Sequence, residues 1–121
     1  MKLENTGIDD AIINVEPLDR LMGRQAFIRG GQWDYERVTY DYKIASKEKN
    51  VTYYIRIQGY AVEGDVDQGD ALIQLKTPFL GKHYYPHGVE YGEDENFPEN
   101  LVDRAINLVT KIKEDVDQYK Q

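Results

Sequence analysis

Three side chains that bind metals, His83, His87 and Glu90, lie close together in the sequence. Two histidines four positions apart bind zinc when both lie on one face of a helix. Here a proline stands between them and two tyrosines follow His83 directly, so a strand is favoured over a helix. A turn at residues 86–88 would instead bring both rings together, with Glu90 as a third ligand. A metal-binding protein or metalloenzyme centred on these residues is therefore the alternative hypothesis, and ordinary hydrogen-bonded or exposed histidines are the simpler interpretation.

The other residue types that perform chemistry form no catalytic pattern. Cysteine is absent, which excludes thiolate nucleophiles and thiolate metal ligands. The one serine, Ser46, begins a polar stretch beside Lys47, and a hydroxyl nucleophile needs a positioned base. The pair Gly30-Gly31 stands alone and does not form a phosphate-binding loop. We therefore expect no catalytic residue and no cofactor, and a non-enzymatic domain is favoured over an enzyme.

The composition is that of an acidic globular domain. The chain has 121 residues, the length of a single domain spanning 1–121, and 15 basic against 22 acidic residues give a net charge of −7. Nucleic-acid binding is disfavoured, because a phosphate-backbone binder needs clustered lysine and arginine. No apolar run reaches the ~20 residues of a membrane span, and the first residues lack the apolar core of a signal peptide. A cytoplasmic location without membrane contact is the expectation.

Hydrophobic periodicity predicts an α+β fold. A short strand is expected first, then a short helix with Pro17 at its first position, a run of strands and a long C-terminal helix. The expected strands are 11–15, 26–33, 36–44, 51–58, 71–77 and 82–85, and the long helix is 98–119. An apolar stripe on that helix must be buried, so we expect a two-layer fold in which helices cover an antiparallel sheet.

The two strands 36–44 and 51–58 alternate between apolar and polar residues. Alternation places one set on the core face and the other on the opposite face. The expected core row is Val38, Tyr40, Tyr42, Tyr53, Ile55 and Ile57. The row of the long helix that packs on it is expected to be Leu101, Ala105, Leu108, Ile112 and Val116.

The opposite face is the predicted binding surface. Tyrosine, tryptophan and arginine are enriched at binding hot spots because they join a large contact area to a polar end. The candidate ligand- or partner-binding residues are Trp33, Tyr35, Tyr54, Arg56, Tyr60, Tyr84 and Tyr85. A homodimer is the simplest partner and a small organic ligand the next, and rings that merely cover the sheet are the equally weighted alternative.

Three stretches, GGQWDYERVTYDYK at 30–43, YYIRIQGYAVEGDVD at 53–67 and HYYPHGVEYGEDENFP at 83–98, resemble the YugN-like family. This family consists of small uncharacterised proteins of bacilli, and the resemblance covers most of the chain. It implies a TBP-like β-α-β(4)-α topology, which agrees with the order expected from periodicity. That fold name describes topology and implies no DNA binding. The resemblance assigns no activity and no functional residue.

Overall fold

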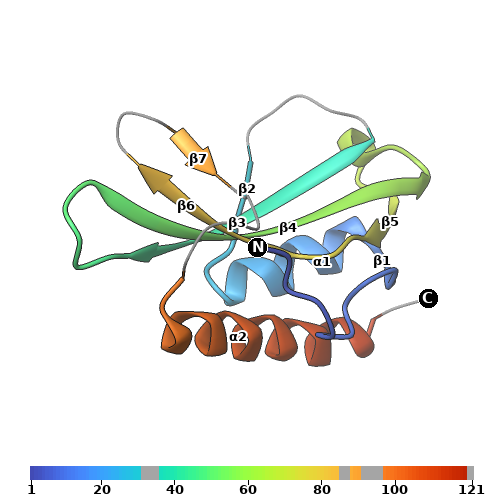
Figure 1. Ribbon diagram of the computed structural model, residues 1–121. Coiled ribbons are helices and arrows are strands. Elements are labelled where there is room, and N and C mark those ends of the chain that lie inside the picture. The colour runs from blue at the N-terminus through green and yellow to red at the C-terminus, as the bar shows by residue number, and fades with distance from the viewer. Residues whose placement is uncertain (31–35, 85–87, 91–96, 120–121) are drawn as a thin grey trace.

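The structure, a computed structural model, describes residues 1–30, 36–84, 88–90 and 97–119. Within these ranges the chain forms two α-helices, one short 3-10 helix and seven strands (Figure 1). Their order is β1 (Ile12–Asn14), α1 (Val15–Arg24), β2 (Ile28–Arg29), β3 (Arg37–Ala45), β4 (Val51–Glu63), the 3-10 helix (Val66–Gln68), β5 (Leu72–Leu75), β6 (Phe79–Tyr84), β7 (Gly88–Glu90) and α2 (Glu99–Asp117).

Both α-helices lie on the same side of the sheet. Figure 1 shows α1 and α2 below it. This confirms the predicted α+β class. The TBP-like arrangement stays a prediction, because six strands separate the two helices in the described chain where the expected order has four. The short strand β7 was not predicted.

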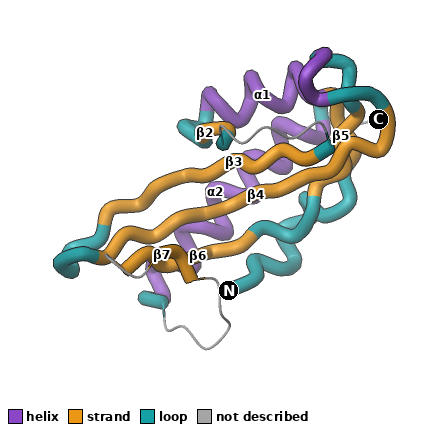
Figure 2. The backbone as a smooth tube through the Cα atoms, turned by 90° about the horizontal axis from the view of Figure 1, so that it is seen from above, coloured by secondary structure: helices purple, strands orange, loops and turns teal. Residues whose placement is uncertain are grey.

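The long strand β4 organises the sheet. On one side it pairs along most of its length with β3, and β2 pairs with the other edge of β3. On the other side its first half pairs with β6 and its last residues pair with β5, and every pairing is antiparallel (Figure 2). β1 adds to β5, and β7 adds to β6. Pro78 lies between β5 and β6, where a residue without an N–H is tolerated.

The predicted alternation on β3 and β4 is confirmed. Val38, Tyr40 and Ile44 are buried on β3, and Tyr42 is half-buried. On β4 the buried residues are Val51, Tyr53, Ile55, Ile57 and Gly59. β4 extends beyond the predicted end at residue 58, and a register shift between Ala61 and Glu63 marks a β-bulge near its C-terminal end.

Helix α2 covers the sheet with a row that differs from the predicted one at a single position. The buried residues are Leu101, Ala105, Val109, Ile112 and Val116. Leu108, predicted in the row, is only half-buried, and its neighbour Val109 is fully buried. Both positions fit a helical stripe, because the apolar arc of α2 is wide enough to include either. The helix is also shorter at each end than predicted.

Helix α1 begins earlier than its proline suggested. The side chain of Asn14 caps it by accepting a hydrogen bond from the backbone N–H of Glu16 at 3.0 Å. Pro17 is therefore the third residue of the helix, not the first, and there it still costs no intrahelical bond because the first turn has no partners for its N–H groups. No helix in the described ranges combines the length and the apolar character needed to cross a membrane.

Candidate functional site

The candidate site is the face of the sheet opposite the helices, which we call the open face. On β3 and β4 it consists of the side chains that alternate with the buried rows. They are Arg37, Thr39, Asp41 and Lys43 on β3 and Tyr54, Arg56, Gln58 and Tyr60 on β4. The structure thus places three of the predicted binding residues, Tyr54, Arg56 and Tyr60, on one face as the alternation predicted. Their role in binding stays a prediction.

An ion pair fixes one arginine on this face. Asp41 and Arg56 lie directly opposite each other on β3 and β4. The Arg56 Nε donates to Asp41 Oδ1 at 2.7 Å, and Arg56 Nη2 donates to Asp41 Oδ2 at 2.8 Å. Two parallel bonds hold the plane of the guanidinium and make this pair more rigid than a single contact would. About a third of the Arg56 side chain remains exposed.

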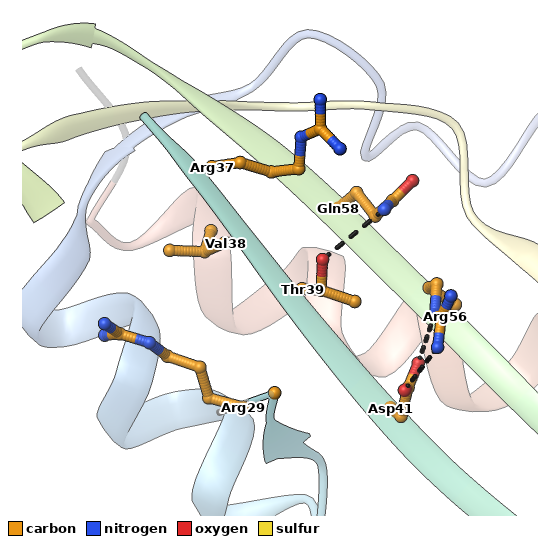
Figure 3. A pocket seen from close by; sticks show the side chains of 8 residues that line it. Arg29, Arg37, Val38, Thr39, Asp41, Arg56 and Gln58 are labelled. Atoms are coloured by element: carbon orange, nitrogen blue, oxygen red, sulfur yellow. Dashed lines mark hydrogen bonds and ion pairs between the residues drawn. The ribbon is translucent and has the colours of Figure 1, made fainter. Parts of the chain in front are cut away.

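A hollow of about 280 Å³ lies beside this pair. The residues lining it come from β2, the position just after β2, β3 and β4, and they are Arg29, Gly30, Arg37, Val38, Thr39, Asp41, Arg56 and Gln58. Figure 3 shows Arg37 at one end and Arg56 at the other, with Thr39 and Gln58 between them. The Gln58 Nε2 donates to Thr39 Oγ1 at 3.4 Å. The hollow is therefore polar along its length and has a guanidinium at each end.

Arg29 lines the hollow, but its guanidinium binds a carboxylate of α1. Its guanidinium points away from the other labelled side chains in Figure 3 and donates to Asp19 of α1 at 2.8 Å. The same carboxylate accepts a hydrogen bond from the Tyr40 hydroxyl at 2.5 Å. Burial, and then this bond to Asp19, raise the pKa of the Tyr40 hydroxyl. These contacts join β2 and β3 to α1 and support the sheet beneath the hollow.

Two cations flank Tyr60. The guanidinium carbon of Arg37 lies 5.1 Å from the centre of the Tyr60 ring, and the Nζ of Lys76 lies 5.7 Å from it. Arg37 and Tyr60 are register partners on β3 and β4, so the contact is a cross-strand pair. Tyr60 is 37% exposed, so part of its ring is open to solvent. Cation–π attraction between the Arg37 guanidinium and the Tyr60 ring helps to hold both side chains on this face.

The open face differs in charge from the chain as a whole. Arg37, Lys43 and Arg56 come from β3 and β4, and Lys76 reaches the same surface at Tyr60. The acidic residues of these two strands are Asp41, which is paired with Arg56, and Glu63, which ends β4 beyond the bulge. The complete chain, by contrast, has a net charge of −7. Four of the chain's 15 basic residues thus lie on the face that the helices leave open.

The metal hypothesis stays a prediction. His83 on β6 is half-buried, and its ring meets the Tyr54 ring edge-on with 6.2 Å between centres. Glu90 on β7 lies opposite Lys82, and Val89 lies opposite His83. His87 falls outside the described residues, and among those described no group of three or more histidine, aspartate or glutamate side chains is placed to hold a metal.

The role of the four other predicted binding residues stays a prediction. Trp33, Tyr35 and Tyr85 lie outside the described ranges, and Tyr84 ends β6. Conversely, the binding prediction missed Arg37, Thr39, Asp41, Gln58 and Lys76. The alternation already placed the first four of these on the open face. What it did not give was the register that puts Arg37 beside Tyr60 and Thr39 beside Gln58.

The fold and the site define a class: a two-layer α+β domain with one sheet face under two helices and a polar, aromatic opposite face. Residues 4–118 match the model of the YugN-like family. The chain is 52% identical over 112 residues to the Bacillus subtilis protein named uncharacterized protein YlbA, covering 93% of this chain and 92% of that protein. The Bacillus subtilis protein YugN is 26% identical over 85 residues, covering 70% of this chain and 62% of that protein.

A solved structure is similar over almost the full length. The crystal structure of the uncharacterized conserved protein YugN from Geobacillus kaustophilus HTA426 has a TM-score of 0.84 and 50% sequence identity, and the match covers 98% of this chain and 96% of that one. The chain therefore belongs to the YugN-like family. The names of these relatives state no activity, so the function must be argued from the site.

Proposed function

We propose that this protein is a non-enzymatic interaction domain whose open face binds an acidic segment of a partner protein. One observation carries the proposal: Arg37, Lys43, Arg56 and Lys76 lie on this face of a chain with a net charge of −7, and Asp41 on the same face is paired with Arg56. Complementary charge steers partners together and fixes their orientation more than it sets affinity. An acidic segment therefore fits this face.

Binding is favoured over catalysis by the state of the one carboxylate in the hollow. Asp41 accepts two hydrogen bonds from Arg56. A carboxylate engaged in this way positions a guanidinium, whereas a general base needs its lone pairs directed at a substrate proton. The exposed aromatic surface of Tyr54 and Tyr60 supplies the apolar contact that charge alone does not give.

A symmetric homodimer through the open face is less favourable on electrostatic grounds. In a two-fold interface each patch faces its own copy, so the four basic residues would approach the same four. Like charges opposed across an interface cost free energy. A small organic ligand remains the other candidate, since the hollow offers it a place. The second copy is an outcome of the experiment below.

The test measures binding of a short fluorescein-labelled poly-glutamate peptide by anisotropy at several salt concentrations. We expect saturable binding that weakens as salt rises, because exposed charges are screened. The double variant Lys43→Gln/Lys76→Gln removes two open-face charges and should weaken binding several-fold. The control, Arg20→Gln/Lys111→Gln, removes the same charge from exposed positions on the two helices and should bind like the wild type.

Three results would contradict the proposal. Equal binding by the two double variants would mean that the chain attracts the peptide without using the open face. Tighter binding of a single-stranded oligonucleotide than of the peptide would assign the face to nucleic acid. A dimer in light scattering that dissociates in Tyr54→Ala/Tyr60→Ala would show that a second copy occupies the face.

A further inference from the structure

We infer that the outer edge of β3, at residues 43–45, takes an extended segment of a partner protein as an added strand. This inference rests on the proposed function, since it states how the acidic segment that binds the open face is held. The partner presents an extended backbone to the edge and an acidic side chain opposite Lys43.

The first observation is that one end of β3 has free backbone groups along its outer edge. The backbone N–H of Gly30 donates to the carbonyl of Thr39 at 2.8 Å, so the polar backbone groups of Thr39 point toward β2. Backbone groups two residues apart in a strand point to the same side, so those of Asp41, Lys43 and Ala45 point there as well. Among the described strands β2 pairs with this edge, and it reaches no further than Asp41 (Figure 2). The N–H and C=O groups of Lys43 and Ala45 are therefore available to a further strand.

The end of helix α1 explains why β2 covers so little of this edge. The N–H of Ala26 donates to the carbonyl of Gly23 at 3.0 Å, and the N–H of Phe27 donates to that of Met22 at 2.9 Å. These are the two bonds of a Schellman motif, and Ala26 has the left-handed φ of 64° that the motif requires. Because the motif fixes the chain where it leaves the helix, pairing with β3 begins only at Ile28.

The second observation is the surface beside this edge on the open face. Lys43 is exposed, and none of the ion pairs between described residues involves it. Ile28, which lies opposite Asp41, is 74% exposed. A hollow of about 530 Å³ borders Lys43, Ile28 and Tyr54. A strand added in line with β2 would lie along this hollow, where it meets one positive charge and an apolar and aromatic surface.

A second hollow, of about 410 Å³, lies between the same end of β3 and helix α2. The residues that line it include Ile44, Ala45, Tyr53 and Leu101. Side chains of a strand alternate between the two faces of a sheet, so a partner residue opposite Lys43 lies on the open face and its neighbour faces the helix-side hollow. When a peptide adds to a sheet edge, backbone bonds give affinity and sites for alternate side chains give specificity. This edge therefore selects an acidic residue next to an apolar one.

The charge of Lys43 favours an acidic partner over a second copy of the chain. Lysine on an exposed edge is a common protection against edge-to-edge association. Two copies paired across an edge this short would bring their Lys43 side chains close together, and like charges opposed across an interface cost free energy. An acidic residue opposite Lys43 forms a favourable cross-strand pair instead. The same lysine thus discourages self-association and admits an acidic segment.

The test measures binding of a short fluorescein-labelled peptide of alternating glutamate and valine to the full chain by anisotropy. The N–H groups of a strand point alternately to its two sides, so glutamates opposite Lys43 and Ala45 would donate to β3 and the valines between them would not. A peptide with N-methylated glutamates should bind at least about tenfold more weakly, because its hydrogen bonds to β3 are lost. A peptide N-methylated at the valines keeps these bonds and should bind like the parent peptide.

Hydrogen exchange gives a second measurement on the protein itself. The bound peptide should slow exchange of the backbone amides of Lys43 and Ala45. The amides of Tyr42 and Ile44 point toward β4 and are the internal controls, so their exchange should not change. Lys43→Gln should weaken binding of the parent peptide several-fold, whereas Lys111→Gln, on the exposed side of α2, should leave it unchanged.

The outcomes separate this inference from the proposed function. Equal binding of the parent and both methylated peptides, without slowed exchange at Lys43 and Ala45, would refute the added strand and leave the proposed function standing. A glutamine–valine peptide that binds as tightly as the parent, and loses affinity when its glutamines are N-methylated, would support the added strand and refute the acidic partner. A dimer in light scattering that the peptide dissociates would show that a second copy occupies the edge and would overturn the inference. Absence of binding by every acidic peptide would overturn both.

Discussion

Replacing Gly59 by alanine tests the packing on which the open face rests. Gly59 is buried in β4 and lies between Val38 of β3 and Leu75 of β5. A Cβ added here would stand 2.4 Å from Cγ2 of Ile73 and 3.1 Å from the backbone oxygen of Gln74. Carbon atoms in good contact are about 3.5–4.0 Å apart, so the Ile73 methyl would have to retreat by about 1 Å or more. It is attached to a branched Cβ in a buried strand and has little freedom to move.

The expected cost follows from this displacement. Inserting a methyl group into a packed core costs about 1–3 kcal/mol. Alanine recovers part of this, because glycine in a strand interior is about 0.5–1 kcal/mol less favourable. We expect Gly59→Ala to lower the free energy of unfolding by about 1–2 kcal/mol, measured by urea denaturation with an unchanged m-value.

Two further variants make the result decisive. Gly23→Ala is the matched control, because a Cβ there meets no atom within 4 Å and alanine is the better helix residue, so this variant should be more stable by up to about 1 kcal/mol. Ile73→Leu moves the branch from Cβ to Cγ and removes the clashing methyl, so Gly59→Ala should cost much less in that background. A Gly59→Ala protein as stable as the wild type, or equal costs in both backgrounds, would refute the described approach of β5 to β4.

Three other predictions concern the core and the histidines. Ile112→Ala should cost about 2–5 kcal/mol in urea denaturation and Leu108→Ala clearly less, and the reverse order would show that the phase of α2 is wrong. Because the pKa of Tyr40 is raised in the folded protein, its hydroxyl contributes stability that is present below the unfolded pKa of about 10 and is lost at higher pH. Unfolding at increasing alkaline pH should therefore show a steeper loss for the wild type than for Tyr40→Phe, and parallel curves would contradict the assignment. Calorimetric titration of chelator-stripped protein with zinc should give no stoichiometric sub-micromolar binding, and such binding, lost in His87→Ala, would establish the metal site instead.

The central strands could be predicted from the sequence because each has one buried face. Alternation over residues 37–44 and 51–58 fixes which side chains share a face, and burial confirms it at Tyr40, Ile55 and Ile57. Other features depend on contacts between segments that are distant in sequence. Which of Leu108 and Val109 is fully buried depends on how α2 packs on the sheet. β7 is a three-residue strand that exists by pairing with β6, and a segment that short carries no periodicity of its own.

The site was predicted less completely than the fold for a related reason. Residue type alone predicts Tyr54, Arg56 and Tyr60 as contact residues, because aromatic residues and arginine are enriched at binding hot spots. Thr39 and Gln58 have ordinary types, and only the register of β3 against β4 places them between two guanidinium groups. Residue type is enough to predict contact residues such as tyrosine and arginine. The neutral polar residues of the hollow can be identified only once the pairing register of the two strands is known.

The same register links the two faces of the sheet. A slip of one residue between β3 and β4 would exchange the faces and bury the open-face arginines in the core, at a cost that no surface contact offsets. Asp41 and Arg56, which line the hollow, form their two hydrogen bonds because the observed register places them opposite each other. Loss of this pair would therefore indicate a change of register. Lys76 is exposed, so a substitution there should change binding with little effect on stability. A substitution at Asp41 should affect both, because it removes the partner that holds Arg56 in position.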